Sequence, residues 1–347
     1  MLQRLRMCRL PRRHSALLGP SHPGPALPQL SASGACPYST RRYVEARRRQ
    51  ARGFLPARVA AAPFAPSPNA DPSEPSTSTP STIYSRPELY DIAFSYRDFK
   101  AEVKFLQDVY KQHGGGPPLA SILELGCGPA RHLAGLARAG VSRVVGLDLS
   151  PDMLQHARAS LAKQGGKAQG VELLQGDMAA FDLPYKSFDL GTFSHMLDTQ
   201  HAISCFRAAA AHLRPGGLLV LEMAHPGDLF DGTLIIGESG KEVWEVPYNG
   251  DKVFVEWGAE YDNFDPVTQI IFRTVTINVL RGDNVVDSVE EVVPYRQFTV
   301  RELELLAGMT GFETSALYGE MRLGVDLEHE DAYRMVAVYH KATAPAA

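Results

Sequence analysis

The stretch that decides the fold is Ser-Ile-Leu-Glu-Leu-Gly-Cys-Gly-Pro-Ala, residues 121–130. Its apolar start predicts a buried strand, its two glycines predict a tight turn, and the leucines of residues 131–139 predict a helix that stops at Gly140. The glycines let the backbone pass close to a ligand, and the helix start offers free N–H groups. Glu124 would repel a pyrophosphate and hold an ammonium group, so the turn favours a ligand that carries a positive charge.

A second acid follows the next predicted strand. Residues 144–148, Val-Val-Gly-Leu-Asp, end in Asp148, which is well placed to accept hydrogen bonds from both hydroxyls of a ribose. Ser150 is then typical of a helix N-cap, and Pro151 of a first helical position. Residues 171–174 predict a third strand, and the sequence Gly-Asp-Met follows it at residues 176–178.

These stretches together resemble the class I S-adenosylmethionine-dependent methyltransferases, over roughly residues 90–341. The resemblance implies a doubly wound α/β fold with a seven-stranded Rossmann-like sheet, and S-adenosylmethionine as cofactor. It also implies that the methionine part of the cofactor is held by Glu124, Gly126 and Gly128, and the ribose by Asp148.

The resemblance adds contacts around the rest of the cofactor. Asp177 would accept from the adenine amino group and the backbone of Met178 would read the ring edge, with Leu149 and Met153 as further cofactor contacts. The alternative for Asp177 is an ordinary loop aspartate.

Residues 90–110 predict a helical approach to the sheet, with an aromatic cluster and Arg97 near its start. In several small-molecule methyltransferases the matching segment covers the sulfonium. The resemblance therefore implies Tyr90 and Arg97 as cofactor contacts, since a ring face attracts a sulfonium and an arginine forks onto a carboxylate. Alternatively, these aromatic residues simply pack the helix onto the sheet.

Two histidines lie at predicted strand ends. His195 follows the fourth strand, residues 187–193, and His225 follows the fifth, residues 218–223. An imidazole there could act as a general base, although alignment of the reactants can supply most of the rate, and His195 could equally bind the substrate or line the adenine pocket. The Asn/Asp-Pro-Pro-aromatic turn typical of enzymes that methylate bases or glutamine side chains is replaced here by Phe-Ser-His-Met, which disfavours those acceptors.

Residues 228–295 change to a strand pattern. Four segments alternate apolar and polar residues between turn signals, which predicts an antiparallel β insertion of some four strands after strand five, on the acceptor side. This layout resembles the N-methyltransferases that dimethylate nucleotide-linked amino sugars and, more loosely, glycine N-methyltransferase. Residues 299–302 then predict a capping box, and residues 312–318 and 333–340 two terminal strands, the last inserted antiparallel between its neighbours.

Charge separates the first 80 residues from the rest. They contain twelve Arg, no Lys and three acids, a balance of +9, which leaves −13 for the remainder of a chain whose net charge is −4. This pattern is typical of an organellar transit peptide and disordered linker, and slightly favours the mitochondrion over the chloroplast. A nucleic-acid-binding tail is the alternative. Residues 81–347 would form the methyltransferase domain.

Composition excludes other classes. No apolar run approaches the ~20 residues that span a bilayer, the cysteines are not spaced as a disulfide framework or metal site, and the acidic remainder makes nucleic acid an unlikely partner. The sequence thus predicts methyl transfer to N or O of a small molecule, without a metal. Alternatives are an organellar assembly factor that binds the cofactor without transfer, and a protein or RNA methyltransferase. The acceptor and the oligomeric state stay open.

Overall fold

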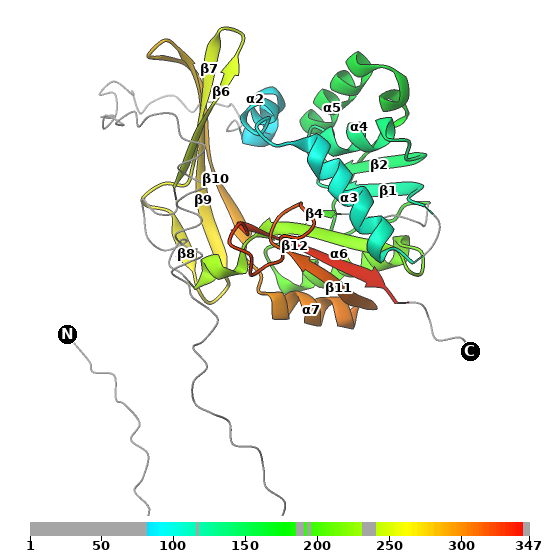
Figure 1. The fold of residues 1–347 in the computed structure, drawn as a ribbon. Coiled ribbons are helices and arrows are strands. Elements are labelled where there is room, and N and C mark those ends of the chain that lie inside the picture. The colour runs from blue at the N-terminus through cyan, green and yellow to red at the C-terminus, as the bar shows by residue number, and fades with distance from the viewer. Residues whose placement is uncertain (1–81, 116–117, 185–190, 193–195, 231–240, 343–347) are drawn as a thin grey trace, which may run out of the picture. The chain divides into compact units, whose positions relative to one another are not determined.

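Two β-sheets organise the chain in the computed structural model, which describes residues 82–115, 118–184, 191–192, 196–230 and 241–342 (Figure 1). The first has seven strands in the order β11-β12-β5-β4-β1-β2-β3. Its strands are β1 (Ser121–Leu125), β2 (Arg143–Asp148), β3 (Glu172–Gln175), β4 (Gly191–Thr192), β5 (Leu218–Ala224), β11 (Phe312–Tyr318) and β12 (Arg334–Lys341). Strands β1 to β5 pair in parallel, and β12 lies antiparallel between β5 and β11. The predicted doubly wound α/β sheet is confirmed, including the insertion of the last strand.

Helices cover both faces of this sheet (Figure 1). One apolar core joins the sheet to α3 (Phe99–His113), α4 (Arg131–Arg138) and α5 (Pro151–Gln164), and a second joins it to α6 (Thr199–His212) and α7 (Val300–Met309). The helices start where the sequence provides caps: Ser150 Oγ accepts from Met153 N–H with Pro151 at the first position, and Thr299 and Glu302 form the predicted capping box. The described residues also include short 3₁₀ helices at Ile83–Ser85 (η1), Gly166–Gly170 (η2) and Pro226–Leu229 (η3).

The second sheet is the antiparallel insertion, with the order β10-β9-β7-β6 and β8 paired to β9. Its strands are β6 (Glu242–Tyr248), β7 (Asp251–Trp257), β8 (Asn263–Asp265), β9 (Ile270–Arg281) and β10 (Asn284–Arg296). It has five strands where the sequence predicted four. The second of the predicted strands, residues 253–261, ends at Trp257 because Gly258 takes a φ of 104°. The Asp262 carboxylate accepts from the N–H groups of Ala259 and Thr274, which turns the chain into β8.

The segment that precedes the first sheet forms two helices, α2 (Pro87–Ala93) and α3, where the sequence predicted a helical approach over residues 90–110. Asp98 caps the start of α3 by accepting from Ala101 N–H, which fixes the break. Residues of η1 and α2 complete the core of the antiparallel sheet, with Ile83, Leu89 and Ala93 all buried against it. In Figure 1, α2 accordingly lies between β6 and β7 on one side and α5 on the other.

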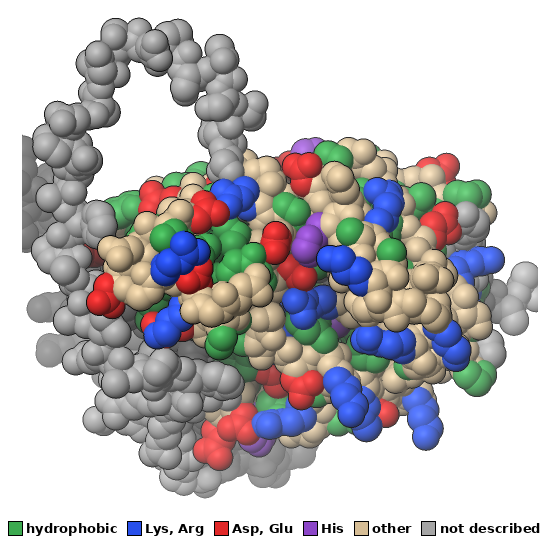
Figure 2. Space-filling model, turned by 90° about the horizontal axis from the view of Figure 1, so that it is seen from above, with side chains coloured by type: hydrophobic (Ala, Val, Ile, Leu, Met, Phe, Trp, Pro, Cys, Tyr) green, Lys and Arg blue, Asp and Glu red, His purple; other side chains and the backbone are tan. Residues whose placement is uncertain are grey.

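Two further features are the length of the helices and the charge of the surface. None of the helices in the described ranges is long and apolar enough to cross a membrane. Figure 2 shows Lys and Arg as well as Asp and Glu side chains spread over one face, with hydrophobic side chains between them. The charged groups of that face are therefore of both signs.

Candidate functional site

The glycine turn after β1 has left-handed backbone at three positions. Gly126 and Gly128 take φ angles of 66° and 48°, and Ala130 takes 61° as it leads into α4. Cys127 N–H donates to the carbonyl of Leu147, which holds the turn against β2. A Cβ atom on Gly128 would meet no atom within 4 Å. The turn therefore leaves open space beside its backbone, as close approach of a ligand requires.

Asp148, at the end of β2, ties this turn to the next one. Its Oδ2 accepts from Gly128 N–H at 2.7 Å and its Oδ1 from Ser150 N–H at 2.8 Å. Each carboxylate oxygen can accept a further hydrogen bond. The backbone thus fixes the orientation of the carboxylate and leaves capacity for a ligand.

The other residues predicted around the cofactor lie nearby on the chain but differ in exposure. Leu149 is 68 % exposed and Met153 only 1 %. Asp177 is exposed, and its Oδ1 accepts from Ala179 N–H at 2.8 Å, while Met178 is half-buried against the core. Because β1, β2 and β3 pair in parallel register, Glu124, Asp148 and Asp177 come to the same edge of the sheet.

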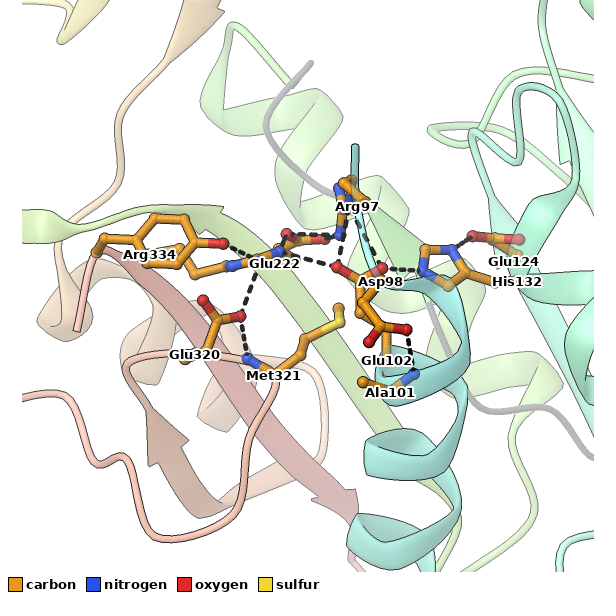
Figure 3. A network of polar contacts seen from close by, with 11 residues as sticks. Arg97, Asp98, Ala101, Glu102, Glu124, His132, Glu222, Glu320, Met321 and Arg334 are labelled. Atoms are coloured by element: carbon orange, nitrogen blue, oxygen red, sulfur yellow. Dashed lines mark hydrogen bonds and ion pairs between the residues drawn. The ribbon is translucent and has the colours of Figure 1, made fainter. Parts of the chain in front are cut away.

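Glu124 is the innermost acid of this edge and only 8 % exposed. Its Oε1 lies 2.9 Å from Nδ1 of His132, on α4, and the opposite ring nitrogen of His132 lies 2.8 Å from Oε2 of Glu102, on α3 (Figure 3). Its second oxygen, Oε2, is buried and has no hydrogen-bond partner among the described residues. An unpaired buried carboxylate oxygen is costly, so this atom is suited to a positively charged ligand group.

Arg97 extends the network toward β5 and β12. Its Nε donates to Glu102 at 3.0 Å, and its terminal nitrogen donates to Glu222 at 2.9 Å. Arg334 contacts Glu222 as well, and its other terminal nitrogen lies 2.7 Å from Glu320. Arg97, predicted as a cofactor contact, is thus already bound to two carboxylates.

The network has an excess of negative charge. Burial alone would raise the pKa of Glu222, but the attraction of Arg97 and Arg334 outweighs it and lowers this pKa to about 2. Burial alone would lower the pKa of His132, but its two neighbouring glutamates raise it to about 9. Within the described residues the network therefore joins three cations to four carboxylates: Arg97, His132 and Arg334, with Glu102, Glu124, Glu222 and Glu320.

Tyr90 lies in an aromatic cluster over this edge. Its ring centroid is 4.7 Å from that of Phe94, and Phe94 contacts Trp244 and Trp257 at 5.8 Å each. Burial raises the pKa of the Tyr90 hydroxyl to about 12. These aromatic residues pack α2 onto the antiparallel sheet, and Tyr90 also lies close enough to Arg97 to interact with it electrostatically.

Of the two predicted histidines, His225 lies within the described residues and His195 does not. His225 is buried, its Nδ1 accepts from Gly227 N–H at 3.0 Å, and its Nε2 lies 3.0 Å from the carbonyl of Leu327. Both ring nitrogens are therefore engaged with backbone. His195 lies outside the described residues, as does most of the predicted fourth strand, of which Gly191–Thr192 is β4.

Sequence reasoning missed His132, Glu102, Glu222 and Arg334. His132 follows the glycine turn by four residues and could have been noticed as an ionisable group on the first turn of the helix. The others carried no local signal. No group of three or more His, Cys, Asp or Glu residues in the described part of the chain is arranged to hold a metal ion.

The chain is similar in sequence to known methyltransferases. The family model "Methyltransferase domain" matches residues 122–217. The chain is 32 % identical over 172 residues to dTDP-3-amino-3,4,6-trideoxy-alpha-D-glucopyranose N,N-dimethyltransferase of Streptomyces venezuelae. The aligned region covers 47 % of this chain and 68 % of that protein. It is 34 % identical over 148 residues to demethylmenaquinone methyltransferase of Lactococcus lactis, and this aligned region covers 41 % of this chain and 55 % of that protein.

A solved structure agrees with the fold. CalS10, an amino pentose methyltransferase from Micromonospora echinaspora solved with SAM bound, matches with a TM-score of 0.55 and 24 % identity, over 73 % of this chain and 97 % of that one. At that identity the similarity establishes the fold alone.

Proposed function

Because this chain belongs to the class I S-adenosylmethionine-dependent methyltransferases, we propose that it transfers a methyl group to a nitrogen or oxygen atom of a small-molecule acceptor. The observation that carries the proposal is the unpaired, buried Oε2 of Glu124 beside the open turn at Gly128. An adenosyl ligand with an amino-acid tail has the groups that match these features. The acceptor class is supported by the amino-sugar substrate in the name of the Streptomyces venezuelae relative.

The residues at the sheet edge fit the cofactor. In the proposal, Asp148 accepts from the ribose hydroxyls and the space at Gly128 admits the methionine part of the cofactor. Glu124 Oε2 accepts from the α-ammonium group. Asp177 lies two residues after the end of β3 and, in the proposal, accepts from the adenine amino group. A site with one excess negative charge also favours a ligand whose net charge is positive.

When bound, S-adenosylmethionine would supply an electrophilic methyl carbon on a positively charged sulfur. The acceptor nitrogen or oxygen would provide the lone pair for the new bond, and the sulfur would keep the electrons of the broken carbon–sulfur bond. The chain contributes alignment of the two reactants, which can account for much of a bimolecular barrier. The backbone contacts on Asp148 and the bonded carboxylate of Glu124 fix the cofactor side.

In the proposal, the methyl acceptor binds at the aromatic surface between α2 and the antiparallel sheet. Trp244 is anchored there because its indole N–H donates to the carbonyl of Ala93 at 2.7 Å. Tyr96 is 55 % exposed, and its ring lies 5.4 Å from that of Trp244 at its edge. Ring faces attract ammonium groups, which supports an amine as the acceptor.

Transfer is tested with the full chain, S-adenosylmethionine labelled in its methyl group and a cell extract, with Asp148→Ala as the control. The proposal expects label in the small-molecule fraction, lost with the variant. Label confined to protein or RNA would contradict the small-molecule acceptor. Binding of cofactor without any labelled product would favour a cofactor-binding assembly factor.

Residues 1–80 are proposed to direct the chain to an organelle, with the mitochondrion favoured, on the strength of their twelve Arg and three acids. A fluorescent protein fused after residue 347 should follow mitochondria in cells, and the same fusion to residues 82–347 should not. Equal distribution of the two fusions would contradict the targeting role.

A further inference from the structure

His132 is the one cation that touches Glu124 among the described residues, and its role follows from where it stands. It occupies the second position of α4, directly after the glycine turn, and its side chain is 14 % exposed. Its ring makes a T-shaped contact with the ring of Phe99, with the centroids 5.1 Å apart, which restricts the plane of the imidazole. The imidazole is therefore held between β1 and α3 and bridges two carboxylates (Figure 3).

We propose that His132, as an imidazolium, is the positioning residue that turns the Glu124 carboxylate so that its free oxygen receives the α-ammonium group of the cofactor. The proposal rests on the proposed role of Glu124 and adds to it the residue that makes this role possible.

The charge state follows from geometry. Glutamate oxygens that are ionised only accept hydrogen bonds, so a ring that bonds to one at 2.9 Å and to another at 2.8 Å must carry a proton on each nitrogen. The charged groups around the ring favour this form: Glu124 from β1 and Glu102 from α3 are in contact with it, and Glu222 from β5 attracts it from farther away. The raised pKa of His132 agrees with this assignment.

Within the ranges that the structure describes, no other cation contacts Glu124. Arg97 and Arg334 lie on the far side of Glu102 and are bound to Glu222. Removal of the imidazolium would leave Glu124 as a buried carboxylate without a partner, and such a group takes up a proton or turns away. Either change would weaken the hold on an ammonium group and leave the contacts to the nucleoside in place.

Two ligands separate this role from a general structural one. S-adenosylhomocysteine carries the ammonium group, whereas 5′-methylthioadenosine has the same nucleoside and sulfur without the amino-acid part. Isothermal titration of the full chain should show that His132→Gln weakens S-adenosylhomocysteine roughly 10- to 100-fold, the loss of one charge-assisted hydrogen bond, and changes methylthioadenosine less than about twofold. Glu124→Gln should behave alike, and the double variant should be no weaker than either single one.

A matched control is His340→Gln. His340 also pairs with a glutamate, Glu313, but it lies beside Leu218 at the start of β5, the opposite edge of the sheet. This variant should bind both ligands as the unaltered chain does. Equal losses of both ligands with His132→Gln, or no loss of S-adenosylhomocysteine, would overturn the proposal. Failure of the unaltered chain to bind either ligand would instead contradict the proposed function.

Nuclear magnetic resonance of the unaltered chain gives a second test that holds even where His132→Gln does not fold. Both ring nitrogens of His132 should be protonated at pH 7, and S-adenosylhomocysteine should shift their signals where methylthioadenosine does not. A neutral ring at pH 7, or equal shifts with both ligands, would refute the positioning role.

Discussion

Replacement of Gly128 by alanine should separate binding from stability. Gly128 has a φ of 48° and open space where a Cβ would stand, so the added methyl group meets no neighbour in the ligand-free chain. The expected cost to folding is the left-handed backbone alone, about 1–2 kcal/mol. The same methyl group fills the space that we assign to the cofactor, and overpacking of a fitted site costs a further 1–3 kcal/mol or about 10- to 100-fold in affinity.

Gly250→Ala is the matched control. Gly250 lies in the turn between β6 and β7 with a φ of 87°, and a Cβ there also meets no atom within 4 Å. Both variants should therefore lose similar amounts of stability in urea unfolding.

Isothermal titration with S-adenosylhomocysteine should distinguish them, because Gly128→Ala alone should lose affinity by at least about tenfold. If both variants bind as tightly as the unaltered chain, the space beside Gly128 is not a ligand site and the reasoning fails.

Three further outcomes are expected. Asp148→Asn should weaken S-adenosylhomocysteine roughly 10- to 100-fold in the same titration, because an amide turns a donor toward the N–H of Gly128 or Ser150 and removes the charge; binding within twofold of the unaltered chain would refute this. His132, with its pKa raised from 6.5 to about 9, should contribute about 3 kcal/mol to the free energy of unfolding, fully present below pH 6.5 and lost as the pH rises toward 9. Thermal unfolding of the ligand-free chain and of His132→Gln from pH 6 to 10 checks this. A stability difference between the two that does not shrink with rising pH would contradict it. Thr299→Ala should cost about 1 kcal/mol in urea unfolding through loss of the α7 capping box and leave ligand affinity unchanged; an unchanged unfolding midpoint would show that the cap contributes nothing.

Local sequence was sufficient where a feature is built from neighbouring residues. The turn of residues 121–130, the N-cap at Ser150 and the capping box at Thr299 each depend on side chains within a few positions, and the structure has them as predicted. Short apolar runs predicted the individual strands, whereas the seven-stranded arrangement was implied by the family resemblance. The extra strand β8 was missed because three residues are too short to show a period.

The charged network could not be predicted because its members are joined by the fold alone. Arg97 and Glu222 are 125 positions apart and meet because α3 lies across β5. The family resemblance implied that Arg97 binds the cofactor carboxylate, and no local pattern indicated the two glutamates that bind its guanidinium group. The sequence identifies a charged residue, but the fold determines which residue forms an ion pair with it.

The most direct test of the central claim is a crystal structure of the chain with S-adenosylhomocysteine. The account predicts that the ribose hydroxyls bind Asp148 and that the α-ammonium group lies within hydrogen-bond distance of Glu124 Oε2. A ligand bound elsewhere, with Glu124 Oε2 still unpaired, would contradict it.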